Sequence, residues 1–411
     1  MANIKHSLRL FRVAFFLAFD SMSVLLLTWW LKFTNTKPAT RKYKYGFVFT
    51  SDIGDMVIFS MFLLVFLKKV DSRCVVITSE VNARLAAPFF PGVEFLVIDY
   101  SKYKTSLVYR FQKTREIRGI SLVSCIVPMR SRDYCVTDSI AKKIRKDTAL
   151  VFTSDESNRI KLEAYIEKYI YDEWLDDFSV DTHELMAYKI LLDKFGVDFQ
   201  AELASVIPAF RAKARETKNL LPPDLPKVFV LMNVGASQLY KRWPIENYIA
   251  LAKRIYAESG IVSLFIGGPS ERNLQGSFKS YPFIIDLILK TGNFEVLKNI
   301  IVNAKYVVSN DTFVSHYSVV LGVPTVNIAG GGHFGRFLPY PKDVYPMFAN
   351  SYTIFKQMPC FHCKWVCNQL AGRSSNSPFP CVSEISVEDV FAVSGKIGAE
   401  QTIKEKEFIS A

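Results

Sequence analysis

Three short segments of this chain carry side chains whose types and spacing suit anion binding and proton transfer. Ser51–Asp55 (SDIGD) ends a glycine-containing turn on a carboxylate, Lys241–Pro244 (KRWP) places two cations before a proline, and Asn310–Pro324 (NDTFVSHYSVVLGVP) opens on a polar turn. An ionised carboxylate is what a general base needs. Cations beside the free N–H groups of a helix start bind phosphate. Each segment alone is a weak signal, but together they favour chemistry on a phosphorylated ligand.

Asp55 is the candidate general base. It follows Tyr45–Thr50 (YGFVFT), a predicted buried strand, and opens the predicted helix Asp55–Lys69. Ligands of open α/β sheets bind beyond the carboxyl ends of the strands, and the helix dipole would keep Asp55 ionised. Capping of the helix is the ordinary alternative, since aspartate is favoured there. Asp52 is the nearby competitor.

Lys241 and Arg242 are candidates for holding a diphosphate. They directly precede Trp243-Pro244, and proline suits the first turn of a helix. Both cations therefore lie just before the predicted helix Ile245–Ser259, where free N–H groups and cationic side chains would converge. The alternative is ordinary surface charge.

The turn that starts at Asn310 is a second candidate anion site. Asp311 and Thr312 form a natural capping pair. The backbone N–H groups of Thr312, Phe313 and Val314 would then be available to phosphate oxygens. His316 could donate to the same phosphates or to a sugar hydroxyl, although a lone histidine on a helix is more often structural.

A glycine-rich loop, Gly330–Gly335 (GGGHFG), follows the predicted strand that begins at Thr325 and precedes Arg336. Consecutive glycines permit positive φ and a close approach of the backbone to a ligand, which makes Gly332 a candidate contact. The loop is not a Walker motif, and the chain contains no GxGxxG fingerprint. A flexible turn is the alternative.

Four cysteines, spaced C-x2-C-x3-C-x13-C, form the last cluster. They are Cys360, Cys363, Cys367 and Cys381. Clustered thiols of this kind suit a tetrahedral structural zinc site, and four thiolates would leave no open position for catalysis. Free buried thiols or a redox pair are the alternatives.

Strands and helices alternate along the chain, which predicts an α/β fold with parallel sheets. Predicted strands lie at Cys74–Thr78, Val93–Ile98, Leu122–Val127, Val228–Met232, Ile261–Ile266, Tyr306–Ser309 and Thr325–Ile328; predicted helices lie at Val81–Phe89, Asp181–Phe195 and Phe294–Asn303. The Pro-rich stretch Leu220–Lys227 (LLPPDLPK) is the best linker, because proline disfavours both helix and central strand. We therefore expect four regions: 1–40, 41–222, 223–395 and a tail at 396–411.

Composition narrows the possible partners. The chain has 411 residues, a formal net charge of +12 and 50% hydrophobic residues, so a basic surface could meet phosphorylated substrate or anionic lipid. The sequence contains no nucleic-acid-binding motif, so nucleic acid is not expected as a partner. The odd count of seven cysteines in so long a chain does not suit a secreted disulfide scaffold.

The N-terminal region contains the apolar stretch Val13–Leu31. A polar stripe (Lys5, Arg9, Arg12, Asp20 and Ser23) recurs at helical spacing on one side of it. This pattern favours an amphipathic helix that lies in a membrane interface, with Trp29 and Trp30 at headgroup level. A true membrane span is the alternative.

Four blocks of the sequence resemble the signature blocks of glycosyltransferase family 9, the bacterial ADP-heptose:lipopolysaccharide heptosyltransferases and their relatives. The blocks are SDIGDMVIFSMFLLVFLKK, NVGASQLYKRWPIENYIALAKRI, FIGGPSER and VSNDTFVSHYSVVLGVPTV, and the resemblance runs from about Tyr45 to Asp389. It implies a GT-B fold, in which two Rossmann-like domains face each other across a cleft. The C-terminal domain would bind a nucleotide sugar and the N-terminal domain the acceptor.

The resemblance also implies roles for single residues. Asp55 matches the family's proposed base, Lys241 the lysine that contacts donor phosphates, and Glu271 the acid associated with the donor ribose. Asp311, Thr312 and His316 match the donor-binding D-T-G-x-x-H block. Phe313 stands where that block usually has glycine, so its ring could intrude on the donor site.

The expected activity is inverting, metal-independent transfer of a sugar, most simply heptose from ADP-heptose, to a lipopolysaccharide core or related glycolipid. No cofactor is expected for catalysis; the cysteine cluster is, separately, a candidate for a structural zinc. The expected location is the cytoplasmic face of the bacterial inner membrane, on its anionic surface. The alternatives are a GT-B-like sugar-nucleotide epimerase and a non-catalytic sugar-binding or assembly protein.

Overall fold

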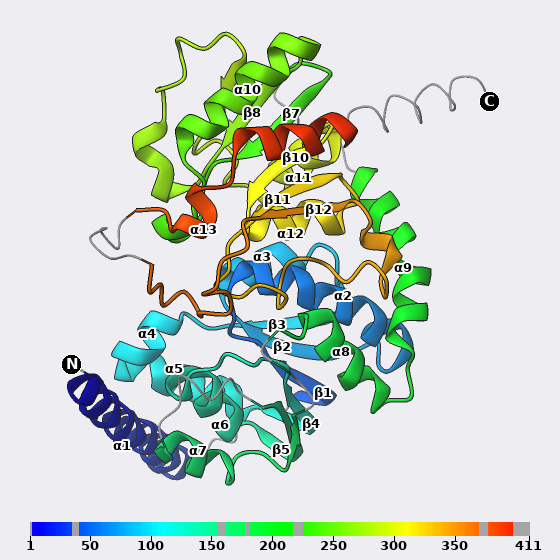
Figure 1. Cartoon of the computed structure of the whole chain (residues 1–411). Helices are drawn as coiled ribbons and strands as arrows, with labels where there is room; N and C mark the ends of the chain where they lie inside the picture. The colour runs from blue at the N-terminus through cyan, green and yellow to red at the C-terminus, as the bar shows by residue number, and fades with distance from the viewer. Residues whose placement is uncertain are drawn as a thin grey trace. The chain divides into compact units, whose positions relative to one another are not determined.

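The chain forms two compact units in a computed structural model (Figure 1) that describes residues 2–34, 41–153, 161–176, 179, 181–216, 225–369 and 377–397. Unit 1 comprises residues 1–178 and 188–199, and unit 2 comprises 179–187 and 200–411. Nearly all of α9 (Phe199–Arg215) belongs to unit 2, so the division precedes the predicted linker, most of which lies outside the described residues.

Unit 1 is built on a parallel six-stranded sheet of order β3-β2-β1-β4-β5-β6. Its strands are β1 (Arg41–Val48), β2 (Cys74–Thr78), β3 (Val93–Val97), β4 (Ile120–Val127), β5 (Arg145–Phe152) and β6 (Glu173–Leu175). Its helices are α1 (Ala2–Thr34), α2 (Ile53–Lys69), α3 (Glu80–Ala86), α4 (Tyr100–Thr105), α5 (Leu107–Arg118), α6 (Ser139–Lys143), α7 (Lys161–Glu167) and most of α8 (Glu184–Asp193), with a π-helical turn η1 (Tyr134–Asp138). The strand order reverses between β1 and β4, which is where ligands of such sheets bind.

Unit 2 repeats this plan with a parallel sheet of order β12-β11-β10-β7-β8-β9. Its strands are β7 (Phe229–Asn233), β8 (Val262–Ile266), β9 (Ile284–Asp286), β10 (Val307–Asn310), β11 (Thr325–Ala329) and β12 (Ser351–Phe355). Its helical elements are α9, η3 (Leu239–Lys241), α10 (Ile245–Ser259), η4 (Pro269–Leu274), α11 (Phe294–Asn303), α12 (Phe313–Val320), η5 (Pro346–Phe348) and α13 (Pro380–Ser383). Here the reversal lies between β10 and β7.

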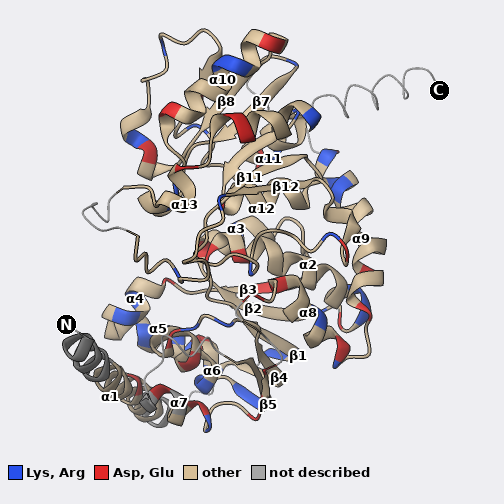
Figure 2. Ribbon diagram, in the orientation of Figure 1, with Lys and Arg blue, Asp and Glu red and all other residues tan. Residues whose placement is uncertain are grey.

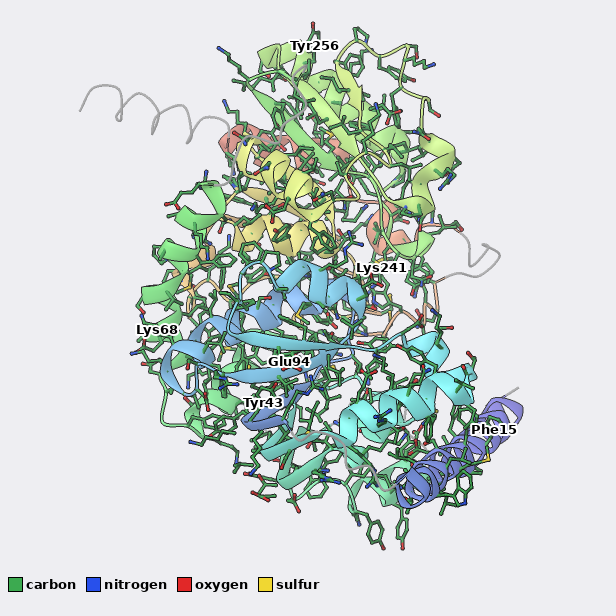
Figure 3. All side chains as sticks on the ribbon, turned by 180° about the vertical axis from the view of Figure 1, so that it is seen from behind. Phe15, Tyr43, Lys68, Glu94, Lys241 and Tyr256 are labelled. Atoms are coloured by element: carbon green, nitrogen blue, oxygen red, sulfur yellow. The ribbon has the colours of Figure 1, made fainter. Side chains whose placement is uncertain are left out.

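The first strand of unit 1 begins earlier than the sequence predicts. The stretch Arg41–Lys44 (RKYK), which precedes the predicted strand Tyr45–Thr50, forms the first half of β1. Two of its residues contact one acid on β3: Arg41 and Tyr43 both bond the carboxylate of Glu94, and Figure 3 labels Tyr43 and Glu94 side by side. Burial, followed by this bond to Glu94, raises the pKa of Tyr43 to about 12. The pairing explains how a charged sequence is accepted within a strand.

Helix α1 packs against α5 and η1 of unit 1 through the side that the sequence predicts as its polar stripe. The buried side chains on this side are Val13, Phe16, Asp20, Ser23 and Leu27. Asp20 Oδ1 accepts from Arg110 Nη2 at 2.6 Å and from Ser139 Oγ at 2.8 Å, and it also pairs with Lys143. The reading of Asp20 and Ser23 as the polar side of an interfacial helix is therefore wrong, because both face the protein.

The side of α1 that faces away from unit 1 is apolar. Phe15, Leu25 and Trp29 expose 52%, 69% and 64% of their surface, and Figure 3 labels Phe15 on this helix. Within the described residues, no helix is both long enough and apolar enough to span a membrane.

Candidate functional site

The centre of the candidate site in unit 2 is a set of buried amides at the point where the strand order reverses. Asn310, the last residue of β10, accepts from the backbone N–H of Trp243 at 2.8 Å and donates to the carbonyl of Gly235 at 3.0 Å. Asn233, the last residue of β7, donates to Thr312 Oγ1 at 3.0 Å. These bonds fix the loop after β7 to the start of α12. The sequence analysis did not identify Asn233 and gave Asn310 no role beyond opening the turn, although a polar residue ending an apolar strand is a usable signal.

Asp311 lies among three nitrogen-bearing side chains. Its Oδ1 is 3.4 Å from His316 Nε2, and the charges of Lys241 and His333 also act on it. Burial is the largest influence on Asp311 and opposes its ionisation. The hydrogen bond and charge of His316, with Lys241 and His333, outweigh burial and hold the Asp311 pKa below its ordinary value of 3.8. The structure therefore brings together predicted residues from two loops, and it adds His333.

His316 is held by a second partner. Its Nδ1 lies 3.1 Å from the hydroxyl of Tyr340, and both side chains are buried. The imidazole thus bridges Asp311 and Tyr340 and has a fixed orientation. Such fixation suits a group that must present one nitrogen to a ligand.

Thr312 is the N-cap of α12, as predicted, but its side chain does not cap. It has extended backbone angles and makes no side-chain bond to the first turn. Its hydroxyl is engaged instead by Asn233. The first-turn N–H groups of α12 thus receive no capping bond from the side chain of Thr312, and N–H groups at a helix start bind anions.

Phe313 begins α12 with ordinary helical backbone, so the glycine common in the family is not conformationally required here. Its ring stacks on Tyr317 with a centroid distance of 5.3 Å and meets Phe294 of α11 edge-on at 5.7 Å. The ring therefore packs onto the helical layer.

Lys241 and Arg242 have different surroundings. The guanidinium of Arg242 donates to the carbonyl of Ala236 at 2.8 Å and pairs with Glu271 at 2.7 Å. Glu271 Oε2 also accepts from Gly268 N–H at 2.8 Å, so this buried carboxylate holds the loops after β7 and β8 together. Lys241 instead extends its ammonium over the ring of Trp365, 4.7 Å from the centroid (Lys241 is labelled in Figure 3).

The glycines of the loop after β11 make room for aromatic rings. A Cβ on Gly331 would lie 2.2 Å from Phe361 Cδ1, and one on Gly332 would lie 2.2 Å from Trp365 Cδ2. Within Gly330–Gly335, positive φ occurs only at Gly335. The close approach that the sequence assigns to a ligand is thus made by the segment 358–367, which we call the strap.

Arg336, predicted at the donor site, is buried and pairs with Glu184 of α8 at 2.7 Å. This ion pair is internal to unit 2. Arg336 therefore has a structural partner in addition to any role toward a ligand.

The four cysteines are free thiols on the strap and at the start of α13. Cys381 Sγ accepts from Gly331 N–H at 3.5 Å. Burial is the main cause that raises the pKa of Cys381, and the other three cysteines add to it. Over the described part of the chain, no three His, Cys, Asp or Glu side chains are placed to hold a metal ion, so the predicted zinc cluster is not formed in this structure.

The remaining predicted site residue, Asp55, lies in unit 1. It occupies the first turn of α2, beyond the carboxyl end of β1. The N-cap position belongs to Asp52, whose side chain makes no capping bond. Thr50, in the same turn, contacts Thr137 of η1 at 2.6 Å, so the turn abuts the segment that follows β4. Asp55 is thus at the strand-order reversal of unit 1, where α/β sheets bind ligands.

Comparison with known proteins fits this geometry. Residues 168–366 match the profile of Glycosyltransferase family 9 (heptosyltransferase). No curated protein sequence matches the chain.

Solved structures match over most of the chain. A family 9 glycosyl transferase from Veillonella parvula superposes with a TM-score of 0.64 at 17% identity, covering 89% of this chain and 100% of that one. E. coli heptosyltransferase WaaC with ADP-2-deoxy-2-fluoro heptose gives 0.57 at 14%, covering 88% and 99%. E. coli ADP-heptose lps heptosyltransferase II gives 0.57 at 14%, covering 88% and 100%. These likenesses confirm the predicted α/β fold. The profile match identifies residues 168–366 as a domain of the Glycosyltransferase family 9 (heptosyltransferase) type, which indicates a glycosyltransferase.

Proposed function

We propose that this enzyme transfers a sugar from a nucleotide diphosphate donor, ADP-heptose in the simplest case, to a glycolipid acceptor of the lipopolysaccharide core type. The observation that carries the proposal is the convergence of Lys241, the open start of α12 and His316 at the strand-order reversal of unit 2. Support for the donor class comes from WaaC, which was solved with an ADP-sugar analogue.

Transfer of a sugar leaves a nucleotide diphosphate whose negative charge grows as the glycosidic bond breaks. Lys241 supplies a fixed positive charge, and the first-turn N–H groups of α12 supply oriented dipoles. The imidazole of His316 is held by Tyr340 through Nδ1 and faces Asp311 through Nε2. It can donate a hydrogen bond to a phosphate oxygen once other positive charges neutralise Asp311. These groups stabilise the leaving group without requiring a divalent cation.

The acceptor hydroxyl must lose its proton as it attacks the anomeric carbon. Asp55 is proposed as the base, because the dipole of α2 favours the ionised carboxylate in its first turn. Direct attack on the face opposite the leaving group inverts the anomeric centre.

The test is a product assay with a panel of nucleotide sugars and a truncated glycolipid acceptor, followed by Lys241→Ala. We expect Lys241→Ala to weaken both ADP binding and turnover, since the lysine meets charge that grows in the transition state. Lys253→Ala, an exposed lysine on α10, is the matched control. Unchanged ADP affinity and turnover in Lys241→Ala would remove Lys241 from the site.

The proposal also places the enzyme on an anionic membrane surface, the cytoplasmic face of the inner membrane. Two features support this placement: the apolar outer side of α1, and the basic side chains of the neighbouring part of unit 1. Lys102 on α4, Arg115 on α5, Lys142 on α6 and Arg145 at the start of β5 are exposed, and Figure 2 shows basic residues on α4, α5 and α6. Apolar side chains next to a basic surface are what anionic bilayers bind.

Cosedimentation with vesicles of phosphatidylethanolamine and phosphatidylglycerol tests this placement. Leu25→Ser together with Trp29→Ser should release the protein from the vesicles, whereas Val228→Ser, which replaces an exposed apolar residue in unit 2, should not. Binding that survives the double substitution would contradict a role for α1.

A further inference from the structure

Trp365 lies between the glycine loop and Lys241, and none of the roles described so far accounts for it. Its ring system lies directly against the backbone: a Cβ on Gly330 would be 2.7 Å from its Cη2, and one on Gly332 would be 2.2 Å from its Cδ2. Its neighbours are aromatic, with ring centroids of Tyr240 at 5.4 Å and Phe379 at 6.3 Å. The face of the ring meets the ammonium of Lys241 at 4.7 Å.

The backbone that carries Trp365 is unusual. Of the four non-glycine residues with positive φ in the described chain, three lie in the strap: His362 (64°), Lys364 (52°) and Trp365 (63°). Left-handed backbone is unfavourable for such residues and persists only where surrounding contacts enforce it. Here the contacts are His362 N–H to Gly331 O at 2.7 Å and Lys364 N–H to Gly332 O at 2.9 Å. The strap is thus held against the glycine loop at the cost of local strain.

The polar end of Trp365 takes no part in holding it. Its indole Nε1 is buried and has no hydrogen-bond partner among the described residues. A buried indole N–H normally finds an acceptor, so the orientation of this ring follows from packing. The polar groups that the ring meets among the described residues include the Lys241 ammonium and, edge-on with a centroid distance of 6.3 Å, the imidazole of His333.

We propose that Trp365 is a positioning residue that fixes Lys241 for the donor diphosphate. This inference rests on the proposed function of Lys241. A lysine on its flexible stem has many rotamers, and ordering it when the ligand arrives weakens binding. An aromatic face under the ammonium orders it beforehand while leaving its outer side open to phosphate. The strap and the three consecutive glycines then have a common purpose, which is to hold the indole at this position.

The alternative is that Trp365 only fills space in the core of unit 2. The two roles differ in their dependence on Lys241. A space-filling residue affects ADP affinity whether or not the lysine is present, whereas a positioning residue acts only through it. They differ also in the response to Phe, which keeps an aromatic face, and to Leu, which does not.

A double-mutant cycle on ADP affinity, measured by titration calorimetry, separates the roles. We expect Trp365→Leu to weaken ADP binding about 3- to 30-fold, the range for losing a cation–π contact. Trp365→Phe should recover most of this loss. In the Lys241→Ala background, Trp365→Leu should have no further effect. If Trp365→Leu does not fold, Trp365→Met, a flexible apolar side chain, takes its place in the same cycle.

The outcomes are distinct for the two proposals. If Lys241→Ala weakens ADP binding but Trp365→Leu does not, or if the two effects are additive, the positioning role is overturned while the proposed function stands. If Lys241→Ala has no effect, or if the wild-type enzyme does not bind ADP, the proposed donor site fails and the positioning role fails with it.

Discussion

The carboxylate of Asp20 is the anion that pairs with two buried cations where α1 packs on the rest of unit 1. Its removal should have a large effect on stability. Asp20 Oδ1 contacts Arg110 Nη2 at 2.6 Å and Nε at 3.1 Å, and Lys143 pairs with the same oxygen. The cation side chains are 0% and 1% exposed. Asp20→Asn keeps the shape of the side chain but leaves two buried cations without an anion.

The magnitude follows from what each cation retains. Breaking a buried pair costs about 3–5 kcal/mol when the remaining charge has no other relief. Lys143 has such relief: burial, with the nearby charge of Arg110, lowers its pKa to about 8 even though Asp20 acts to raise it. Without Asp20 the pKa of Lys143 falls further, so bringing Lys143 to the neutral form at pH 7 costs at most about 1.4 kcal/mol. Arg110 keeps the hydrogen bond that it donates to the carbonyl of Tyr103 at 2.8 Å. We therefore expect Asp20→Asn to lower the free energy of unfolding by about 3 kcal/mol, at the low end of that range.

Urea unfolding at pH 7 gives the global effect, and hydrogen exchange of α1 gives the local one. Asp147→Asn, an exposed aspartate on β5, is the matched control. The pH dependence supplies a sign. Although burial opposes ionisation of Asp20, Lys143 and Arg110 outweigh it and lower its pKa below 3.8. Its stabilisation is therefore present above 3.8 and lost as pH falls through the lower folded pKa. A loss below about 0.5 kcal/mol, typical of surface substitutions, would refute the reasoning.

Three further predictions concern the candidate sites. Asp55→Asn should reduce turnover by at least ~10²-fold with little change in ADP affinity, because it removes the base but leaves unit 2 intact; wild-type turnover would end its candidacy. Gly331→Ala should cost about 1–3 kcal/mol by urea unfolding, since its Cβ would overlap Phe361, and Gly292→Ala, with nothing within 4 Å, is the control. Asp311→Asn should be less stable than wild type above pH 3.8, with the difference in melting temperature vanishing as pH falls through the depressed Asp311 pKa; a difference that persists in acid would rule out the charge interaction.

The sequence predicted the elements that are buried and periodic. Cys74–Thr78, Ile245–Ser259 and Phe294–Asn303 were predicted with the observed bounds, because apolar runs and capping residues mark them clearly. It could not predict that Arg41–Lys44 is strand, since the partner that accepts this charge, Glu94, is on another strand. Local pattern does not reveal such long-range pairing.

The candidate site shows the same limit. Lys241, Asp311 and His316 were predicted and lie in one electrostatic neighbourhood. The sequence identified the glycine loop but not why glycine is needed there. The aromatic rings that occupy the space beside it belong to Phe361 and Trp365, about thirty residues later in the chain. The sequence predicted the helical spacing of the polar stripe of α1 but assigned Asp20 and Ser23 to the side facing water, whereas both are buried. A sequence does not tell whether an acid faces water or a buried cation.

The connection through Asp20 also constrains the order of events during synthesis. Its partners Arg110 and Ser139 follow it by 90 and 119 residues, and chains leave the ribosome N-terminal end first, at about 5–20 residues per second. Helix α1 is therefore made several seconds before the residues that seat it exist. In that interval both of its sides are uncovered, the apolar one and the one bearing a lone carboxylate. Helix α1 can therefore dock fully only after the chain has been synthesised as far as Lys143.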